Sequence, residues 1–142
     1  MMKRIACAAA VLTALCVGGL VAADKADLKC PISGKPVNPA ATVDFNGGKV
    51  AFCCMNCPKA FEADSAKYAA KANHQLYQSG QLKQVACPLA GKPINPATEI
   101  EVAGTKVAFC CNNCKGKVAA ADADKQIELV FANTSKGFKP AK

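Results

Sequence analysis

An internal repeat constrains this chain more than any other feature of its sequence. Residues 30–57 align with residues 87–114 at a constant shift of 57 positions without a gap, and 17 of the 28 aligned residues are identical. At several of the positions where the copies differ, size and polarity are kept, as Val43 in one copy and Ile100 in the other illustrate. Self-similarity at a fixed period indicates repeated structural units. The sequence therefore predicts two similar modules rather than one larger domain.

Each copy contains a pattern typical of a β-hairpin. In the first copy, Val43 and Phe45 flank a polar residue, a glycine-containing turn follows at 46–48, and Val50 and Phe52 resume the apolar face. The glycine inside the turn supplies the positive φ that tight hairpins need. The second copy repeats the pattern with Ile100, Val102, a turn at 103–105, Val107 and Phe109. We expect Phe52 and Phe109 to be core residues.

The residues after each hairpin are typical of short helices. In the first copy we expect a helix over 56–63 and a second one, capped by Asp64 or Ser65, that runs to about Gln78. In the second copy the expected helices cover 114–121 and 124–132. The sequence thus predicts an α+β fold of two small modules, each a β-hairpin followed by short helices.

The N-terminal residues have the three-part pattern of a secretory signal peptide. Residues 1–4 carry two positive charges, residues 5–21 form an apolar run, and small residues at 21–23 precede the polar Asp24. A membrane anchor is the alternative, because roughly 17 apolar residues lie near the lower limit for a spanning helix. With cleavage after Ala23, we expect a periplasmic or secreted protein without stable membrane insertion.

The domain organisation follows from the signal and the repeat. We predict a signal peptide at 1–23, a first module at 24–80, a second module at 81–133 and a loose C-terminal tail at 134–142. Removal of the signal takes away Lys3 and Arg4, so the net charge falls from +8 to +6 and the remaining 16 basic residues are all lysine. The absence of arginine, the few aromatic residues and the expected export argue against nucleic-acid binding.

Cysteine provides the candidate site chemistry. Each copy carries the pattern C-x22-C-C-x2-C, with one cysteine before the hairpin and a cluster where its second strand leads into a helix. Thiolates from such distant positions can meet around one tetrahedral ion. Modules of this size often need a metal or disulfides, since their apolar cores are small. The candidate metal ligands are Cys30, Cys53, Cys54, Cys57, Cys87, Cys110, Cys111 and Cys114.

These motifs resemble a known family of small domains. The spacing C-x22-C-x3-C, the segment GGKVAFCCMNC and the segment FEADSAKY at 61–68 are similar to those of YHS and TRASH domains, which are treble-clef-like metal-binding modules. The resemblance covers nearly all of the first copy and residues 87–118 of the second. It implies metal ligation by Cys30, Cys53 and Cys57, and by Cys87, Cys110 and Cys114.

The chain departs from the family pattern at several positions. Ser33 and Ala90 stand where many such domains have a cysteine, and Cys54 and Cys111 are additional. These additional cysteines would complete a four-sulfur site, although the side chains of adjacent residues diverge. In the second copy, the positions that match Phe61 and Tyr68 hold Val118 and Lys125.

Sulfur-only ligation selects soft or borderline metals. We therefore expect a thiophilic metal ion, zinc first and Cu(I) second, and a protein that binds metal for structure or for sequestration. The sequence does not name a protein partner.

Two alternatives remain open at this point. The eight cysteines left after signal removal are an even number that could pair completely in an oxidising compartment, giving a disulfide-stapled interaction module without metal. The pairs Cys54/Cys57 and Cys111/Cys114 have the C-x-x-C spacing of thiol-disulfide oxidoreductases, but no βαβ pattern surrounds them. We expect no enzymatic activity. The only histidine, His74, is expected on the surface.

Overall fold

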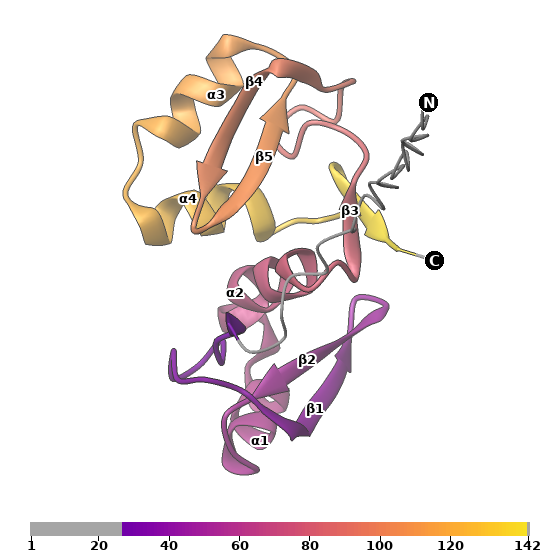
Figure 1. Ribbon diagram of the computed structural model, residues 1–142, viewed down its shortest axis with the longest axis vertical. Coiled ribbons are helices and arrows are strands. Elements are labelled where there is room, and N and C mark those ends of the chain that lie inside the picture. The colour runs from indigo at the N-terminus through magenta and orange to yellow at the C-terminus, as the bar shows by residue number, and fades with distance from the viewer. Residues whose placement is uncertain (1–26, 142) are drawn as a thin grey trace, which may run out of the picture.

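The computed structural model of the protein describes residues 27–141. The predicted signal peptide, with Cys7 and Cys16, lies outside these residues. The structure has the predicted α+β fold in two modules (Figure 1), and within the described residues no helix has the length and apolar character needed to cross a membrane. In chain order the elements are β1 Asn38–Phe45, β2 Gly48–Phe52, α1 Asn56–Ala63, α2 Ser65–Gln78, β3 Leu82–Gln84, β4 Asn95–Val102, β5 Thr105–Phe109, α3 Asn112–Ala119, α4 Ala123–Phe131 and β6 Phe138–Pro140.

Both predicted hairpins are present, and their turns have the same backbone conformation. β1 pairs with β2 and β4 with β5, each antiparallel, across a two-residue turn. In the first turn Asn46 and Gly47 have φ values of 49° and 78°, and in the second Ala103 and Gly104 have 47° and 80°. Positive φ at both central residues is the type I′ geometry that matches strand twist. Alanine at the first position is strained, by about 1–2 kcal/mol.

The first strand of each hairpin begins earlier than the alternating pattern indicated. β1 and β4 contain Pro39 and Pro96, and in both the pairing register shifts across the segment that holds the proline, between Asn38 and Thr42 and between Asn95 and Ile100. A proline cannot donate a hydrogen bond to a neighbouring strand, so it is tolerated at such an irregularity.

The helices of the first module have the predicted positions, whereas those of the second module begin earlier. The side chain of Asp64 accepts a hydrogen bond from the backbone of Lys67 at 3.3 Å and so caps α2, as predicted. In the second module α3 begins at Asn112, and α4 is capped by Asp122. The capping carboxylate therefore lies two residues before the predicted start of the last helix.

Each module has its own small core. In the first, Phe52, Phe61, Ala72 and Leu76 are fully or almost fully buried, and Tyr68 packs against them. In the second, the corresponding Phe109 is also fully buried. The core of the second module is completed by Val102, Val107, Val118, Val130, Phe131 and Phe138. The predicted core positions Phe52 and Phe109 are confirmed.

The two modules pack against each other through α2 and α4, which lie side by side at the centre of the molecule (Figure 1). Asn73 of α2 is 1% exposed; its amide donates to the carbonyl of Phe131 at 2.8 Å and accepts from the Asn46 side chain at 2.6 Å. Tyr77 contacts the rings of Phe131 and Phe138. One helix of the first module therefore contributes to the core of the second.

The prediction of a loose tail at 134–142 is wrong for the described part of that segment. β6 pairs antiparallel with β3, so residues expected to be a linker and a tail form one small sheet. Phe138 is only 4% exposed and stacks on Phe131. The sequence pattern missed this sheet because each strand has three residues, too few to show alternation.

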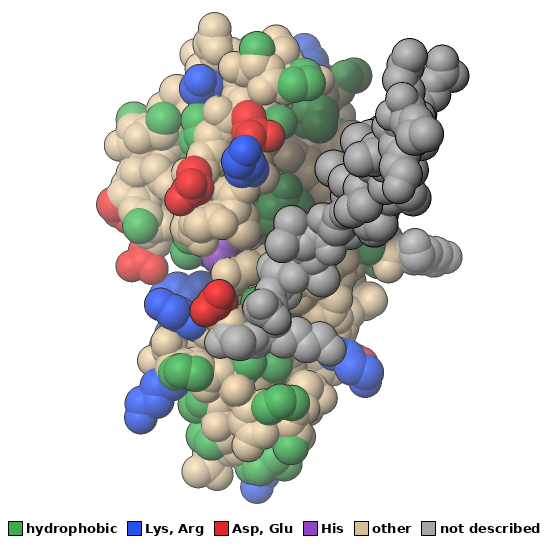
Figure 2. All heavy atoms as spheres, viewed as in Figure 1, with side chains coloured by type: hydrophobic (Ala, Val, Ile, Leu, Met, Phe, Trp, Pro, Cys, Tyr) green, Lys and Arg blue, Asp and Glu red, His purple; other side chains and the backbone are tan. Residues whose placement is uncertain are grey.

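Charged side chains of both signs lie on the surface (Figure 2). On the face shown in Figure 2, lysine and acidic side chains are interspersed. Of the four ion pairs among residues 27–141, three join residues of the same module. The fourth, between Lys71 and Asp124 at 3.2 Å, joins α2 to α4. Exposed pairs of this kind contribute about 0–1 kcal/mol each.

Candidate metal centres

The first cysteine of each module sits in a tight backbone turn. The backbone N–H of Cys30 donates to the carbonyl of Lys35 at 2.8 Å, and its carbonyl accepts from Gly34 at 2.9 Å. The corresponding distances around Cys87, to Lys92 and Gly91, are both 2.8 Å. The glycines have φ values of 69° and 66°, which side chains other than glycine adopt at a cost. The turn fixes where the first sulfur points.

The other three cysteines of each module lie at the junction between a strand and a helix. Cys53 and Cys54 follow β2 directly, and Cys57 lies in the first turn of α1. The second module places Cys110 and Cys111 after β5 and Cys114 in the first turn of α3. The hairpin brings this junction back to the turn that carries the first cysteine.

Three sulfurs converge in each module. The Sγ atoms of Cys30, Cys53 and Cys57 all lie within 4.8 Å of one another, and so do those of Cys87, Cys110 and Cys114. The Cys53 and Cys57 sulfurs are 3.6 Å apart and the Cys110 and Cys114 sulfurs 3.7 Å. A tetrahedral ion with sulfur ligands at about 2.3 Å separates them by about 3.8 Å. A disulfide bond would need about 2.05 Å, so these two pairs of sulfurs stand at ligand spacing.

The additional cysteines lie beside these sets of three rather than within them. The Cys54 sulfur is 3.8 Å from that of Cys53 and 3.6 Å from that of Cys57. In the second module the Cys111 sulfur is 3.7 Å from that of Cys110. Both are exposed, whereas the other six cysteines of residues 27–141 are buried or partly buried. The structure therefore brings six of the eight predicted ligands together and places two at the rim.

The protonation of the thiols fits a cation site. Burial raises the pKa of the Cys30 thiol, but hydrogen bonds from Ser33 and nearby backbone amides outweigh it and lower the pKa to about 7. Burial, together with the neighbouring thiols, raises the pKa of Cys57 to about 12.

The second site also contains one thiol with a lowered pKa and another with a raised pKa. Backbone hydrogen bonding from Cys114, with the neighbouring Cys110 thiol, lowers the pKa of Cys111 to about 7, and burial with the neighbouring thiols raises that of Cys114 to about 12. In each site at least one thiol has a lowered pKa and the last cysteine has a raised one. A thiophilic cation would bind the thiolates and displace the remaining protons.

Comparison of the chain with family models, curated proteins and solved structures found no match. The two sulfur clusters are the features of this chain that bear on its function.

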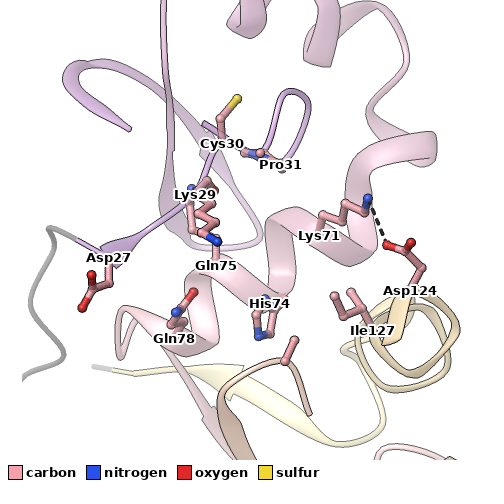
Figure 3. Close-up of a pocket in the computed structure, with 12 residues that line it drawn as sticks. Asp27, Lys29, Cys30, Pro31, Lys71, His74, Gln75, Gln78, Asp124 and Ile127 are labelled. Atoms are coloured by element: carbon pink, nitrogen blue, oxygen red, sulfur yellow. Dashed lines mark hydrogen bonds and ion pairs between the residues drawn. The ribbon is translucent and has the colours of Figure 1, made fainter. Parts of the chain in front are cut away.

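His74 is not a ligand in these clusters, and it is half-buried rather than exposed. It lines a pocket of about 430 Å³ between the modules, together with Cys30 and Asp124, but the Cys30 sulfur points away from it (Figure 3). The His74 ring packs against Phe131 at 5.1 Å, and burial lowers the pKa of the imidazole. The prediction of surface exposure is wrong because it considered the first module alone, whereas the second module covers this side of α2.

A glutamine in each module ties the cysteine turn to the hairpin. The Gln75 amide donates to the carbonyl of Lys29 at 2.9 Å and exchanges two hydrogen bonds with the backbone of Ala51 at 2.7 and 2.8 Å. These residues precede Cys30 by one position and Cys53 by two. The side chain therefore holds the first ligand of the site close to the second.

Gln84 forms the same bridge in the second module. It donates to the carbonyls of Ala86 and Ala108 at 3.2 and 2.6 Å and accepts from the Ala108 N–H at 3.0 Å. Ala86 and Ala108 match Lys29 and Ala51 at the repeat shift of 57. The glutamines themselves are only 9 positions apart, so comparison of the copies could not reveal them.

Ser33 distinguishes the first site from the second. Its hydroxyl lies 3.1 Å from the Cys53 sulfur and also hydrogen bonds to the Cys30 thiol. Alanine occupies the matching position 90 in the second module. Serine at position 33 therefore contributes a hydrogen-bonding group that the second site lacks.

Proposed function

We propose that this protein binds two thiophilic metal ions, one in each module, and that it acts without catalysis in metal storage or as a metal-stabilised structure. The convergence of three sulfurs from remote chain positions carries the proposal. The spacing of the sulfurs is that of ligands around a tetrahedral ion of the zinc or Cu(I) class. Cys30, Cys53 and Cys57 would hold one ion, and Cys87, Cys110 and Cys114 the other.

Binding would also stabilise the modules. Each set of sulfurs joins the turn before the hairpin to the start of the following helix. An ion that bridges these parts binds the folded state and not the open chain, so its binding free energy adds to the free energy of unfolding. Kinship with YHS and TRASH domains, supported by the cysteine spacing and the hairpin, is part of this proposal.

We propose a periplasmic or extracellular location for this activity. The support is the signal-like pattern of residues 1–23, which lie outside the described part of the chain. No nucleic-acid target is proposed, because the surface cations are lysines interspersed with acidic groups.

Native mass spectrometry of the exported protein, purified without chelator, tests the function. We expect two ions per chain. The repeat supplies matched controls: Cys30→Ser and Cys87→Ser should each remove one ion and leave the ion of the other module. A protein that takes up neither Zn²⁺ nor Cu⁺ while its thiols are free would contradict the proposal.

The same spectra separate the alternatives. A disulfide-stapled protein would lack metal and be lighter by one hydrogen for each of its eight paired cysteines. A thiol-disulfide oxidoreductase would catalyse the reduction of insulin and lose that activity on Cys57→Ser. We expect neither result.

A further inference from the structure

The four cysteines of each module are graded in exposure in the same order. The first cysteines, Cys30 and Cys87, are 2% and 0% exposed. The second and fourth cysteines of each module are partly buried, and the third, Cys54 or Cys111, is exposed. Because the two modules differ in many supporting residues, an order that recurs in both reflects the shared arrangement of strand, junction and helix. The rim position of Cys54 and Cys111 is therefore a property of the site.

The buried and partly buried sulfurs pack in or against the module cores, whereas the rim sulfurs are held only by backbone N–H groups at the helix start and by neighbouring thiols. Cys30 and Cys87 are held by the turn and by the glutamine bridge from Gln75 or Gln84. The last cysteine of each set is part of a helix. Cys54 and Cys111 lie between strand and helix, outside both elements, and their side chains pack against neither core.

Each rim sulfur is nevertheless at ligand spacing from at least one sulfur of its set of three. The Cys54 sulfur lies 3.8 and 3.6 Å from two of its neighbours, which is the separation of two ligands on one tetrahedral ion. Cys111 has the same relation to Cys110, at 3.7 Å. Each site thus consists of three supported sulfurs and a fourth that faces solvent.

We propose that Cys54 and Cys111 are exchangeable fourth ligands, through which the bound ion passes to and from the thiolate of an incoming thiol. This inference rests on the proposed metal binding. The incoming thiol loses its proton and forms a metal–sulfur bond, the bond to Cys54 or Cys111 breaks, and the released thiolate takes up a proton. No electron is transferred, and the oxidation state of the metal is unchanged. The three supported sulfurs retain the ion during this first exchange, and the ion leaves when further thiolates displace them one by one in the same way.

Alkylation of the zinc-loaded protein tests the first part of the proposal. With iodoacetamide and peptide mass spectrometry, we expect Cys54 and Cys111 to react about tenfold or more faster than the other six cysteines, since accessible thiols react first. Native mass spectra of the doubly alkylated protein should still show two zinc ions. Equal protection of all eight cysteines, or loss of zinc on alkylation of these two, would overturn the proposal.

Isotope exchange tests the second part and identifies the thiol. Protein loaded with one zinc isotope is mixed with a second isotope and with either glutathione or a Cys-x-x-Cys peptide. We expect the thiol to accelerate exchange in the wild type, and Cys54→Ser/Cys111→Ser to bind glutathione as a mixed complex in native spectra. Acceleration by glutathione points to a small thiol, and acceleration by the peptide alone points to a protein donor. No acceleration by either would overturn the proposal.

Failure of metal binding and failure of ligand exchange are distinguishable. If the wild type binds no zinc at all, the metal-binding function is wrong. If it binds two ions that no thiol exchanges, the function stands and the role of Cys54 and Cys111 is wrong. Cys30→Ser is the control, because loss of a supported sulfur should release the ion of its module.

Discussion

The two modules have the same cysteine geometry but support it differently. In the first, the glutamine that ties the cysteine turn to the hairpin comes from α2, after the site; in the second, Gln84 comes from β3, before the site. The backbone of the second hairpin strand also has different hydrogen-bond partners. In the first module the Gln81 side chain bonds to Lys49, and in the second the Tyr77 hydroxyl donates to the carbonyl of Lys106. The position of the sulfurs is therefore kept, while the residues that secure it differ between the modules.

The cores differ in the same way. The aromatic rings of the first core, Phe45, Phe52 and Phe61, come from its own hairpin and first helix. The second module has Val102 and Val118 where the first has Phe45 and Phe61, and it fills its core with Phe131 and Phe138 and with Tyr77 of α2. The second module therefore depends on the C-terminal segment and on its neighbour.

The largest expected effect follows from that dependence. Phe138→Ala should destabilise the second module by about 3–5 kcal/mol, the usual cost of removing a buried aromatic ring. Hydrogen exchange of the zinc-loaded protein should show faster exchange in β3, β6 and α4, with the first hairpin little changed. Leu129→Ala, at a side chain 39% exposed, is the control and should cost much less. Equal loosening of both hairpins would contradict the comparison.

The glutamine bridges give the next largest effect. Gln75→Ala removes three hydrogen bonds and leaves backbone groups of Lys29 and Ala51 unpaired, so we expect about 2–3 kcal/mol of destabilisation. Zinc titration with a competing chelator should show weaker binding at the first site only, and Gln84→Ala should weaken only the second. The control is Gln78→Ala on the same helix. If Gln75→Ala weakened both sites alike, the glutamine would not be a module-specific support.

The pH dependence of metal binding gives a smaller effect. The pKa of Cys57 is raised to about 12, so at neutral pH an incoming ion displaces its proton, and affinity should rise about tenfold per pH unit for each proton released. The pKa of Cys30 is about 7. Below pH 7 its thiol is also protonated and the slope should steepen; above pH 7 it should flatten. Affinity measured by chelator competition at pH 6 and pH 8 checks this, and an affinity that falls as pH rises would contradict it.

The smallest effect concerns the serine that only the first module has. Ser33→Ala removes a hydroxyl that hydrogen bonds to the Cys30 and Cys53 sulfurs, at about 0.5–1.5 kcal/mol. The pKa of Cys30 should rise, and the change of slope at the first site should move to higher pH. Ala90→Ser is the matched reverse variant and should move the second site toward the first. Titration of the thiols, followed by the absorbance of the thiolate at about 240 nm, measures the shift in pKa. Unchanged titration in both variants would show that the hydroxyl has no such role.

The fold of each hairpin and the first two helices could be predicted because their signals are local. The alternation around Val43 and Val50, the turn glycine and the cap at Asp64 each act within a few residues. The convergence of the sulfurs was predictable in outline, because the repeat shows which cysteines belong to the same site. These predictions needed no information about how the modules meet.

The remaining features depend on contacts between distant segments. The burial of His74 and the strand at 138–140 arise from packing of α2 and β3 against the second module. Gln75 and Gln84 have the same role but different positions in the repeat, so no alignment of the copies relates them. The exposure of Cys54 and Cys111 follows from where strand becomes helix, which the cysteine spacing alone does not fix.

X-ray absorption at the metal edge of the zinc-loaded protein tests the central claim most directly. The account predicts that every ion has sulfur neighbours at about 2.3 Å, with three or four per ion, and that Cys30→Ser and Cys87→Ser each abolish one of the two sites. A first shell dominated by nitrogen or oxygen, or a protein whose eight cysteines are all cross-linked in pairs and bind no metal, would contradict it.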